Sequence, residues 1–287
     1  MKVMIIGAGG QLGRDLSIHM QAAGYAVHGY DRRRLDITDE KRVFEAMRRL
    51  KPDAVIHAAA YTAVDEAEAQ PEAAFRVNAA GTRNIAAAAE EVGAKLCYIS
   101  TDYVFDGEKG SPYLEYDAPN PVNVYGCSKY AGEELVRSLT SRWYIVRVSW
   151  LYGAQGKNFV KTMLSLAAEK QEIQVVDDQI GSPTYTVDAA RFVSMLISTS
   201  KYGIYHAANS GSCSWYEFAA SIFALLNQDI PLIPIPTELY PRPAKRPRYS
   251  VLEAMAIRSE GFAPMRHWQD ALKDYLREHA GRDGKVC

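Results

Sequence analysis

The fold is decided by the stretch MKVMIIGAGGQLG at residues 1–13, where a short apolar run meets a cluster of glycines. The apolar run Val3 to Ile6 predicts a buried β-strand, and Gln11 to Ala23 has the spacing of an amphipathic helix. Glycines at every third position from Gly7 allow a tight connection between the two. A strand, a glycine turn and a helix in this order predict the first unit of a parallel α/β sheet.

The same alternation continues to about residue 150. Apolar runs predict four more strands, at 26–30, 54–58, 96–100 and 144–148, and helical spacing predicts helices at 39–49, 72–92 and 123–138. Thr38 is the expected N-cap of the first of these helices. Because parallel strands are joined by right-handed crossovers, we expect a doubly wound parallel sheet of the Rossmann type, with helices on both faces.

A second, smaller lobe is expected over residues 151–287. Six prolines between Pro231 and Pro247 indicate an ordered loop or lobe edge, and Ser214 with Glu217 has the spacing of a capping box that begins a helix to Leu226. The segment near 186–207 is expected to return to the main domain, with residues 203–207 joining the sheet. No clean boundary between the lobes is therefore predicted.

Composition narrows the classes of function. The chain has 287 residues, 48% of them hydrophobic, and 33 Lys and Arg against 34 Asp and Glu, which gives a formal charge of −1. This balance argues against a dedicated nucleic-acid binder. The four cysteines (Cys97, Cys127, Cys213 and Cys287) form no CxxC pair, and no histidines have metal-ligand spacing, so no metal site is expected. No apolar run approaches a membrane span, and we expect a soluble, cytoplasmic protein.

The glycine turn is suited to a phosphate ligand. Gly7, Gly10 and Gly13 allow backbone amides to approach a pyrophosphate, and the helix N-terminus adds partial positive charge. A tight turn without a ligand is the alternative. We predict a dinucleotide-binding domain over residues 1–150, with the cofactor NADPH or NADH. Asp31, at the end of the second strand, favours NAD through a ribose hydroxyl. Arg32 and the two arginines after it suit a 2′-phosphate, or a solvated turn.

A candidate catalytic group follows the fourth strand. Tyr125 and Lys129 are four residues apart, hence on one face of a predicted helix, and the ammonium is expected to lower the pKa of the phenol. Thr101 ends the fourth strand, at the edge where an open α/β sheet holds ligands. Its hydroxyl is placed to meet both the phenol and a substrate oxygen, although Ser-Thr at this point also suits a simple strand end.

These features together resemble the extended short-chain dehydrogenase/reductase family. Further segments, spread over the whole chain, resemble its dTDP-4-dehydrorhamnose reductase branch. They are AAAYTAVDEAE (58–68), YVFDG (103–107), VSWLYG (148–153), QIGSPTY (179–185) and RPRYS (246–250).

The resemblance implies reduction of dTDP-4-dehydro-β-L-rhamnose, a nucleotide sugar, at C4 to dTDP-L-rhamnose, the final step of dTDP-rhamnose biosynthesis. It implies Tyr125 as proton donor, Lys129 as holder of the nicotinamide ribose, and Thr101 as support for the carbonyl and phenol. Further cofactor contacts are implied for Gly10, Gln11, Leu12, Asp36, Ile37, Ala58, Ala60, Tyr61 and Thr62. Asp102 and Trp150 are expected to meet the sugar, with ordinary core packing as the alternative for Trp150.

Two other functions remain open at this point. Sugar-nucleotide epimerases and dehydratases share the fold. The dehydratases resemble one another in a Thr-Asp-Glu triplet, whereas the third position here is Tyr103, which favours simple reduction. A non-catalytic NADP-binding regulatory subunit also shares the fold. Some of these reductases are magnesium-bridged dimers that use glutamates, but Asp15 is a shorter carboxylate, so magnesium is doubtful and a monomer or weak homodimer is expected.

Positive charge gathers in one short segment. Residues 241–248 (PRPAKRPR) carry four basic side chains and no acidic one. On the reductase hypothesis, Arg246 is the first candidate for the substrate diphosphate. A solvated basic loop is the alternative.

Overall fold

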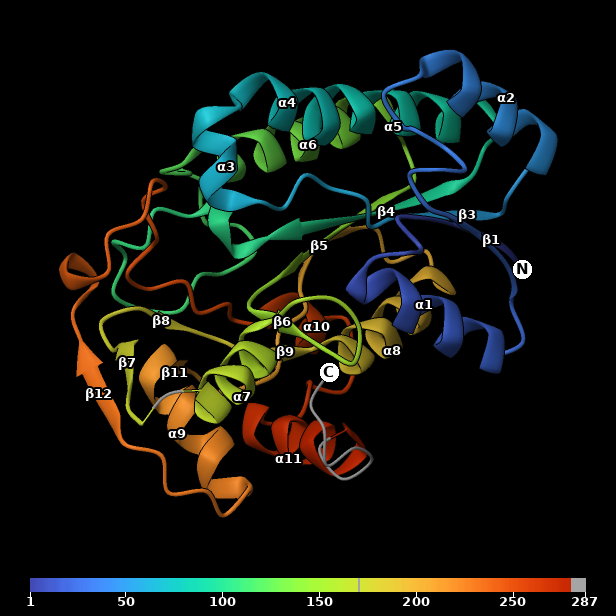
Figure 1. Cartoon of the computed structure of the whole chain (residues 1–287). Helices are drawn as coiled ribbons and strands as arrows, with labels where there is room; N and C mark the ends of the chain where they lie inside the picture. Colours follow the sequence, from blue (N-terminus) through green and yellow to red (C-terminus); the bar gives the residue numbers. More distant parts are fainter. Residues whose placement is uncertain (170, 280–287) are drawn as a thin grey trace.

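The computed structural model describes residues 1–169 and 171–279, and its centre is a sheet with helices on both faces (Figure 1). Six strands pair in parallel in the order β10-β5-β4-β3-β1-β2. They are β1 (Lys2–Ile6), β2 (Ala26–Tyr30), β3 (Ala54–His57), β4 (Lys95–Thr101), β5 (Trp143–Val148) and β10 (Gly203–His206). The predicted doubly wound parallel sheet is confirmed, and it contains every strand expected in the first half.

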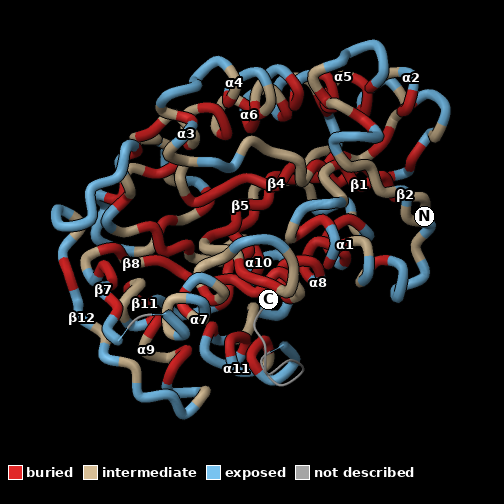
Figure 2. Tube along the Cα trace, in the orientation of Figure 1, coloured by how far each residue is buried: buried red, intermediate tan, exposed pale blue. Residues whose placement is uncertain are grey.

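Each face of the sheet has its own core. Alternate residues of β1 point to opposite faces, so Val3 and Ile5 lie in one apolar cluster while Met4 and Ile6 lie in the other. The first face is covered by α1 (Gln11–Ala22) and α8 (Thr186–Ile197), and the second by α2 (Glu40–Leu50), α5 (Thr82–Glu91) and α6 (Val124–Leu139). Figure 2 shows the central strands as the most continuously buried part of the chain.

The long helix predicted over 72–92 is divided. The structure has α3 (Val64–Ala69), α4 (Pro71–Phe75), a π-helical turn η1 (Arg76–Gly81) and then α5. Pro71 suits the first turn of α4, where a backbone N–H has no helical partner, so a new helix begins there. The π turn carries Asn78, whose buried amide bonds to other segments instead of to solvent.

Polar side chains fix the starts of three helices. Asp39, and not Thr38 as expected, caps α2 by accepting from the Arg42 N–H, while Thr38 donates to Asp36. Asn123 caps α6 in the same way. The predicted capping box is confirmed at the start of α9 (Trp215–Leu225), where Ser214 and Glu217 bond reciprocally.

The second half adds short elements around a third apolar core. These are β6 (Leu151–Tyr152), α7 (Phe159–Glu169), β7 (Ile173–Val176), β8 (Ile180–Gly181), β9 (Thr184–Tyr185), β11 (Cys213–Ser214), α9, β12 (Leu232–Ile235) and α11 (Trp268–His279), with the 3-10 turn η3 (Thr237–Leu239). Phe218, Trp268 and Leu272 lie at the centre of this core. In contrast, α10 (Met255–Ser259) packs on the first face of the main sheet through Ile257, and the 3-10 turn η2 (Asp102–Val104) follows β4 in the first half. Cys287 lies outside the described residues.

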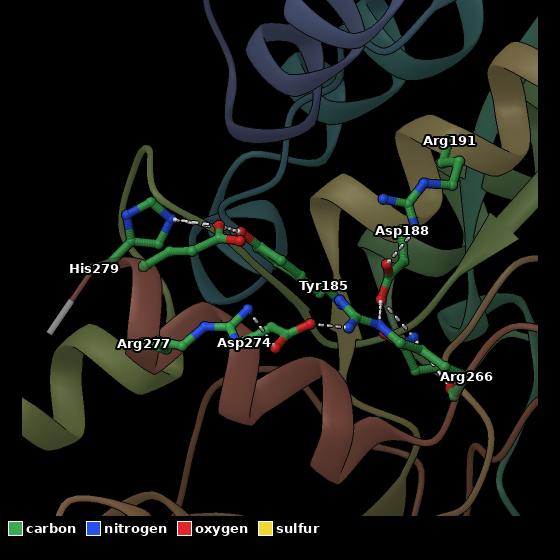
Figure 3. Close-up of polar contacts among 9 residues, drawn as sticks. Tyr185, Asp188, Arg191, Arg266, Asp274, Arg277 and His279 are labelled. Atoms are coloured by element: carbon green, nitrogen blue, oxygen red, sulfur yellow. Dashed lines mark hydrogen bonds and ion pairs between the residues drawn. The ribbon is translucent and has the colours of Figure 1, made fainter. Parts of the chain in front are cut away.

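Helix α11 is held to α8 by an ionic network. Arg266 donates to Asp188 of α8 at 2.8 Å and pairs with Asp274 of α11, which Arg277 also contacts at 3.0 Å (Figure 3). Asp188 is only 6% exposed, so its charge depends on these partners. The network therefore fixes the last described helix against the main domain.

Within residues 1–169 and 171–279, no helix is both long and apolar enough to span a membrane. Over the same described ranges, no three His, Cys, Asp or Glu side chains gather into a group that suits a metal ion.

Candidate active site

The glycine turn has the geometry of a ligand cradle. Gly7 has φ +84°, and a Cβ there would lie 2.6 Å from the Ala59 backbone nitrogen. A Cβ on Gly13 would lie 2.1 Å from the Gly7 carbonyl oxygen. Both positions therefore require glycine, because β1, the turn and the start of α1 pack without space for side chains.

The N-terminus of α1 fits an anionic group. Its N-cap residue, Gly10, provides no side chain to cap the first turn, and that turn contains no acidic residue. The partial positive charge of the first N–H groups is thus left to a ligand, as a cofactor diphosphate requires. Leu12 is buried in the core beside the sheet, and Gln11 donates to the Leu151 carbonyl at 3.2 Å, so the turn is tied to the strand β6.

The acidic and basic residues after β2 have separate positions. Asp31 lies against the turn, with its Cβ 3.3 Å from a Cβ built on Gly9, and it accepts from the Arg34 N–H. Arg32 is exposed, whereas Arg34 donates to the Gly29 carbonyl at 2.7 Å. Asp31 and Arg32 thus remain together at the edge of the cradle.

Two expected adenine contacts lie just beyond. Thr38 donates to the Asp36 carboxylate from both its N–H and its hydroxyl, and the backbone bond is the main reason that the pKa of Asp36 is lowered. Ile37 is 5% exposed and packs into the core, where a Cβ on Gly81 would touch it at 2.7 Å. Asp36 is therefore more accessible to a ligand than Ile37.

The segment after β3 is fixed by the π turn. Ala58 and Ala60 are half-buried, Tyr61 is half-buried, and Thr62 is exposed. The Asn78 amide accepts from the Tyr61 N–H at 2.7 Å and donates to the Tyr61 carbonyl at 3.1 Å. Its amide nitrogen also donates to Ser128, 2.9 Å away on α6. Asn78 therefore connects this segment to the helix that carries Tyr125 and Lys129.

Helix α6 brings Tyr125 and Lys129 to the carboxyl end of β4. Gly126 allows close packing there, since a Cβ would lie 2.2 Å from the Tyr103 carbonyl oxygen. The Lys129 Nζ donates to the Ile99 carbonyl at 2.7 Å and lies 4.0 Å from the centre of the Tyr98 ring. Tyr125 and Lys129 lie on one face of α6, as expected. The Lys129 ammonium, however, contacts the Ile99 carbonyl of β4 and the face of the Tyr98 ring.

Burial controls both pKa values. It raises the pKa of Tyr125 to about 12, against a smaller lowering effect of the Thr101 hydroxyl. It lowers the pKa of Lys129 to about 7, against the opposing carboxylate of Glu133. The expectation that Lys129 would lower the pKa of Tyr125 is wrong for the unliganded chain, because desolvation by burial is the main influence on this phenol and raises its pKa. The phenol is consequently protonated at neutral pH.

Thr101 and Asp102 are buried where β4 ends and η2 begins. Thr101 is 5% exposed and Asp102 is 2% exposed. The Thr101 hydroxyl donates to Asp102 Oδ1 at 3.0 Å, while Ser149 and Ser250 donate to Asp102 Oδ2 at 3.1 and 2.7 Å. The predicted substrate residue Asp102 is therefore surrounded by protein hydroxyl groups.

A cleft of about 1530 Å³ lies close to this group and is lined by residues from both halves of the chain. Its lining includes Tyr103, Trp215, Arg242, Lys245 and Arg246. The Tyr103 ring meets the Tyr125 ring edge to face, with centroids 5.6 Å apart, so Tyr125 lies directly behind a residue that lines the cleft. The volume is sufficient for a nucleotide sugar.

Arg246 lies in the cleft but has a protein partner. Its guanidinium donates to Asp65 Oδ1 at 2.7 Å, and Arg242 pairs with the same carboxylate at 3.8 Å. The Asn123 amide, at the start of α6, donates to the Lys245 carbonyl at 2.8 Å. The basic segment is thus docked on α3 and on the start of α6, the helix that carries Tyr125 and Lys129.

Trp150 forms an aromatic stack. Its ring lies on the Trp215 ring with centroids 3.4 Å apart and an interplanar angle of 6°. Trp150 has φ +46°, and a Cβ on Gly181 would lie 2.4 Å from its indole. Trp215, not Trp150, lines the cleft. The stack therefore places Trp150 behind Trp215.

Sequence analysis did not identify four residues of this site: Asp65, Asn78, Ser250 and Trp215. Each acts through a partner far away in the chain, such as Asp65 with Arg246. Asp65 and Ser250 lie inside segments that carry the family resemblance, whereas Asn78 and Trp215 lie outside them.

Comparisons with known proteins agree with this geometry. The family model described as RmlD substrate binding domain matches residues 1–280. Among curated proteins, the chain is 45% identical to the spore coat polysaccharide biosynthesis protein SpsK of Bacillus subtilis (strain 168), covering 97% of this chain and 98% of that protein. It is 44% identical to a dTDP-4-dehydrorhamnose reductase of Streptomyces griseus, covering 98% and 95%.

Solved structures extend the comparison. A dTDP-4-dehydrorhamnose reductase from Bacillus anthracis str. Ames, in complex with NADP, superposes with a TM-score of 0.95 at 46% identity, covering 96% of this chain and 99% of that one. A UDP-glucose 4-epimerase from Thermus thermophilus, complexed with NAD, has a TM-score of 0.86 at 21% identity, covering 99% and 100%, and shares the fold.

Proposed function

The chain belongs to the dTDP-4-dehydrorhamnose reductase family, and we propose that it carries out this reduction with Tyr125, Lys129 and Thr101. It is an NAD(P)-dependent oxidoreductase that takes a nucleotide-sugar ketone as substrate. The observation that carries the residue assignment is the position of Tyr125, whose phenol lies within hydrogen-bond reach of Thr101 and whose ring packs edge to face on Tyr103 of the cleft lining.

The residues of the cradle would hold the cofactor. Gly7, Gly10 and Gly13 leave room for a diphosphate against the start of α1, and Asp31 and Arg32 lie where the adenosine ribose is expected. Lys129, whose Nζ lies next to the Ile99 carbonyl near the carboxyl end of β4, would orient the nicotinamide ribose. When bound, NADPH or NADH supplies the hydride.

Tyr125 supplies the proton in this proposal. The reduced carbonyl becomes an alkoxide at C4, and the phenol transfers its proton to that oxygen, leaving a phenolate. Burial keeps the phenol protonated until the alkoxide forms, since the pKa of Tyr125 is about 12 in the unliganded chain. Thr101 lies close enough to stabilise the phenolate by donating a hydrogen bond.

The cleft would receive the rest of the substrate. We assign residues 151–287 mainly to the nucleotide sugar, with the segment 186–207 belonging to the main domain. Arg246 would bind the diphosphate, exchanging Asp65 for phosphate oxygens. Trp150 and Asp102 remain proposed sugar contacts.

Two wider properties also belong to this proposal. The enzyme acts in the cytoplasm, because both of its ligands are multiply charged and do not cross a bilayer unaided. It acts as a monomer or weak homodimer. These properties are separable from the assignment of the proton donor.

A spectrophotometric assay with a Tyr125→Phe variant tests the proposal. With dTDP-4-dehydrorhamnose present, the chain should oxidise NADPH, seen as loss of absorbance by the reduced cofactor. Tyr125→Phe should bind NADPH normally and lose about 10²–10⁴-fold in kcat, because the phenol is the general acid. The control is Tyr116→Phe, an exposed tyrosine outside the site, which should retain wild-type kcat. Near-wild-type turnover by Tyr125→Phe would remove the phenol as proton donor.

A further inference from the structure

We propose that Asp102 is a positioning residue, which holds the hydroxyl hydrogen of Thr101 while Tyr125 is protonated and releases it to the Tyr125 phenolate after proton transfer. This inference rests on the roles proposed above for Thr101 and Tyr125. It assigns Asp102 a part in the reaction that does not require contact with the sugar.

The hydrogen bonds of Thr101 define its resting state. Its hydroxyl oxygen accepts from the Tyr103 N–H at 3.2 Å, and its only hydroxyl hydrogen is donated to Asp102 Oδ1 at 3.0 Å. A hydroxyl oxygen accepts two hydrogen bonds, so one acceptor position remains for the neutral phenol of Tyr125. A protonated Tyr125 is therefore compatible with Thr101 bonded to Asp102.

Proton transfer reverses this preference. The Tyr125 phenolate has no hydrogen to give and requires donors, so the Thr101 hydrogen has two competing acceptors, Asp102 and the phenolate. Rotation of one hydroxyl satisfies the phenolate without moving the backbone. No proton leaves Thr101 in this step: the only proton transferred is the phenolic one, from Tyr125 to the C4 alkoxide.

Asp102 can lose this bond because its other oxygen is supported independently. Oδ2 accepts from Ser149 at the end of β5 and from Ser250 in the segment that follows the basic loop. Both hydroxyl bonds stay in place when Thr101 turns away. Burial raises the pKa of Asp102 to about 6, with the hydroxyls of Ser250, Thr101 and Ser149 opposing the rise, so the carboxylate is charged at neutral pH.

The location of Asp102 favours this role. The residue is 2% exposed, and each of its carboxylate oxygens already accepts from a protein hydroxyl. A side chain that served mainly to bind sugar would present an oxygen to the cleft. Asp102 instead presents its Oδ1 to Thr101.

A double-mutant cycle tests the inference. Steady-state kinetics would be measured for the wild type, Asp102→Ala, Thr101→Val and the double variant. We expect Asp102→Ala to lower kcat about tenfold, with KM for the sugar nucleotide changed less than twofold. Because Asp102 acts through Thr101, the double variant should be no slower than Thr101→Val alone. Multiplicative losses, or a raised KM with normal kcat, would overturn the inference.

A conservative variant separates positioning from folding. Asp102→Asn retains a carbonyl oxygen for Thr101, and its kcat should stay within about threefold of wild type. A loss above tenfold in Asp102→Asn would contradict the inference, even where Asp102→Ala fails to fold by thermal unfolding and NADPH titration. If Thr101→Val itself retains full kcat, the proposed role of Thr101 fails instead, so the two failures are distinguishable.

Discussion

Asp31 and Arg32 place opposite charges at one edge of the cofactor cradle. The Asp31 carboxylate is suited to a ribose hydroxyl, while the exposed Arg32 guanidinium is suited to a 2′-phosphate. Arg34, which donates to the Gly29 carbonyl and lies over the Tyr30 ring, has a local structural role. The choice between NADPH and NADH is therefore expected to depend on Arg32.

Substitution of Arg32 tests this dependence. Arg32→Ala should raise KM for NADPH about tenfold and leave KM for NADH within twofold, because only NADPH loses a charge-assisted bond. Arg33→Ala, an exposed neighbour, is the matched control and should change neither value by more than twofold. Equal effects of Arg32→Ala on both cofactors would assign the arginine run to a solvated turn.

Site residues whose arrangement depends only on their near neighbours in the sequence were predictable. Gly7 and Gly13 were recognisable by their spacing, and Tyr125 and Lys129 by their shared helix face. Their electrostatics were not predictable, because the burial that raises the pKa of Tyr125 depends on the whole packed structure. Nor was the partner of Arg246, since Asp65 lies 181 positions earlier in the sequence.

At the scale of elements, the periodic strands and helices were predicted well and the irregular ones were not. The helix expected over 72–92 contains a π turn, because Asn78 bonds to Tyr61 and Ser128 instead of facing solvent. Helical periodicity carries no signal for that bonding. The short strands of the second half are two to four residues long, below the length at which alternation is readable.

The attachment of α11 gives a prediction at this scale. Arg266→Ala leaves the buried Asp188 carboxylate without its main partner, and should lower the free energy of unfolding by about 2–3 kcal/mol. Asp274 of α11 pairs with both Arg266 and the exposed Arg277. Arg277→Ala removes only that exposed pair and should lower the free energy of unfolding by under about 1 kcal/mol. Chemical denaturation of both variants provides the comparison. Equal losses would show that the network of Figure 3 does not hold the helix.

The whole molecule has an expected response to acid. His57 is fully buried at the end of β3, and Thr82, whose hydroxyl donates to the Asn78 carbonyl, accepts from His57 Nε2. The Nδ1 atom has no partner, so a second ring proton would be buried unpaired. Burial, aided by Lys129, lowers the pKa of His57 to about 3.

The pH dependence of stability follows from linkage. In the unfolded chain, histidine binds a proton below pH ~6.5, whereas folded His57 does so only near 3. The contribution of neutral His57 to the free energy of unfolding is complete above pH ~6.5. This free energy falls as the pH drops from ~6.5 towards about 3, by up to ~1.4 kcal/mol per pH unit. His57→Gln should therefore reduce the pH dependence of unfolding between pH 7.5 and 5, by about 1–2 kcal/mol. Parallel stability curves for variant and wild type would contradict this role for His57.

The arrangement of the whole molecule also predicts where the hydride and the proton are added to the substrate. On the proposed function, the cradle would bring the nicotinamide to the carboxyl end of the sheet and Tyr125 would meet the substrate oxygen from α6, so hydride and proton would be added at one carbonyl. The central claim is that this carbonyl is C4 of the sugar.

Reduction with NADPH deuterated at both C4 positions of the nicotinamide tests that claim most directly. Product dTDP-L-rhamnose, examined by NMR and mass spectrometry, should contain one deuterium, bound at C4 of the sugar. Product without deuterium at C4, or with deuterium at another sugar carbon, would contradict direct reduction of the C4 carbonyl in this site.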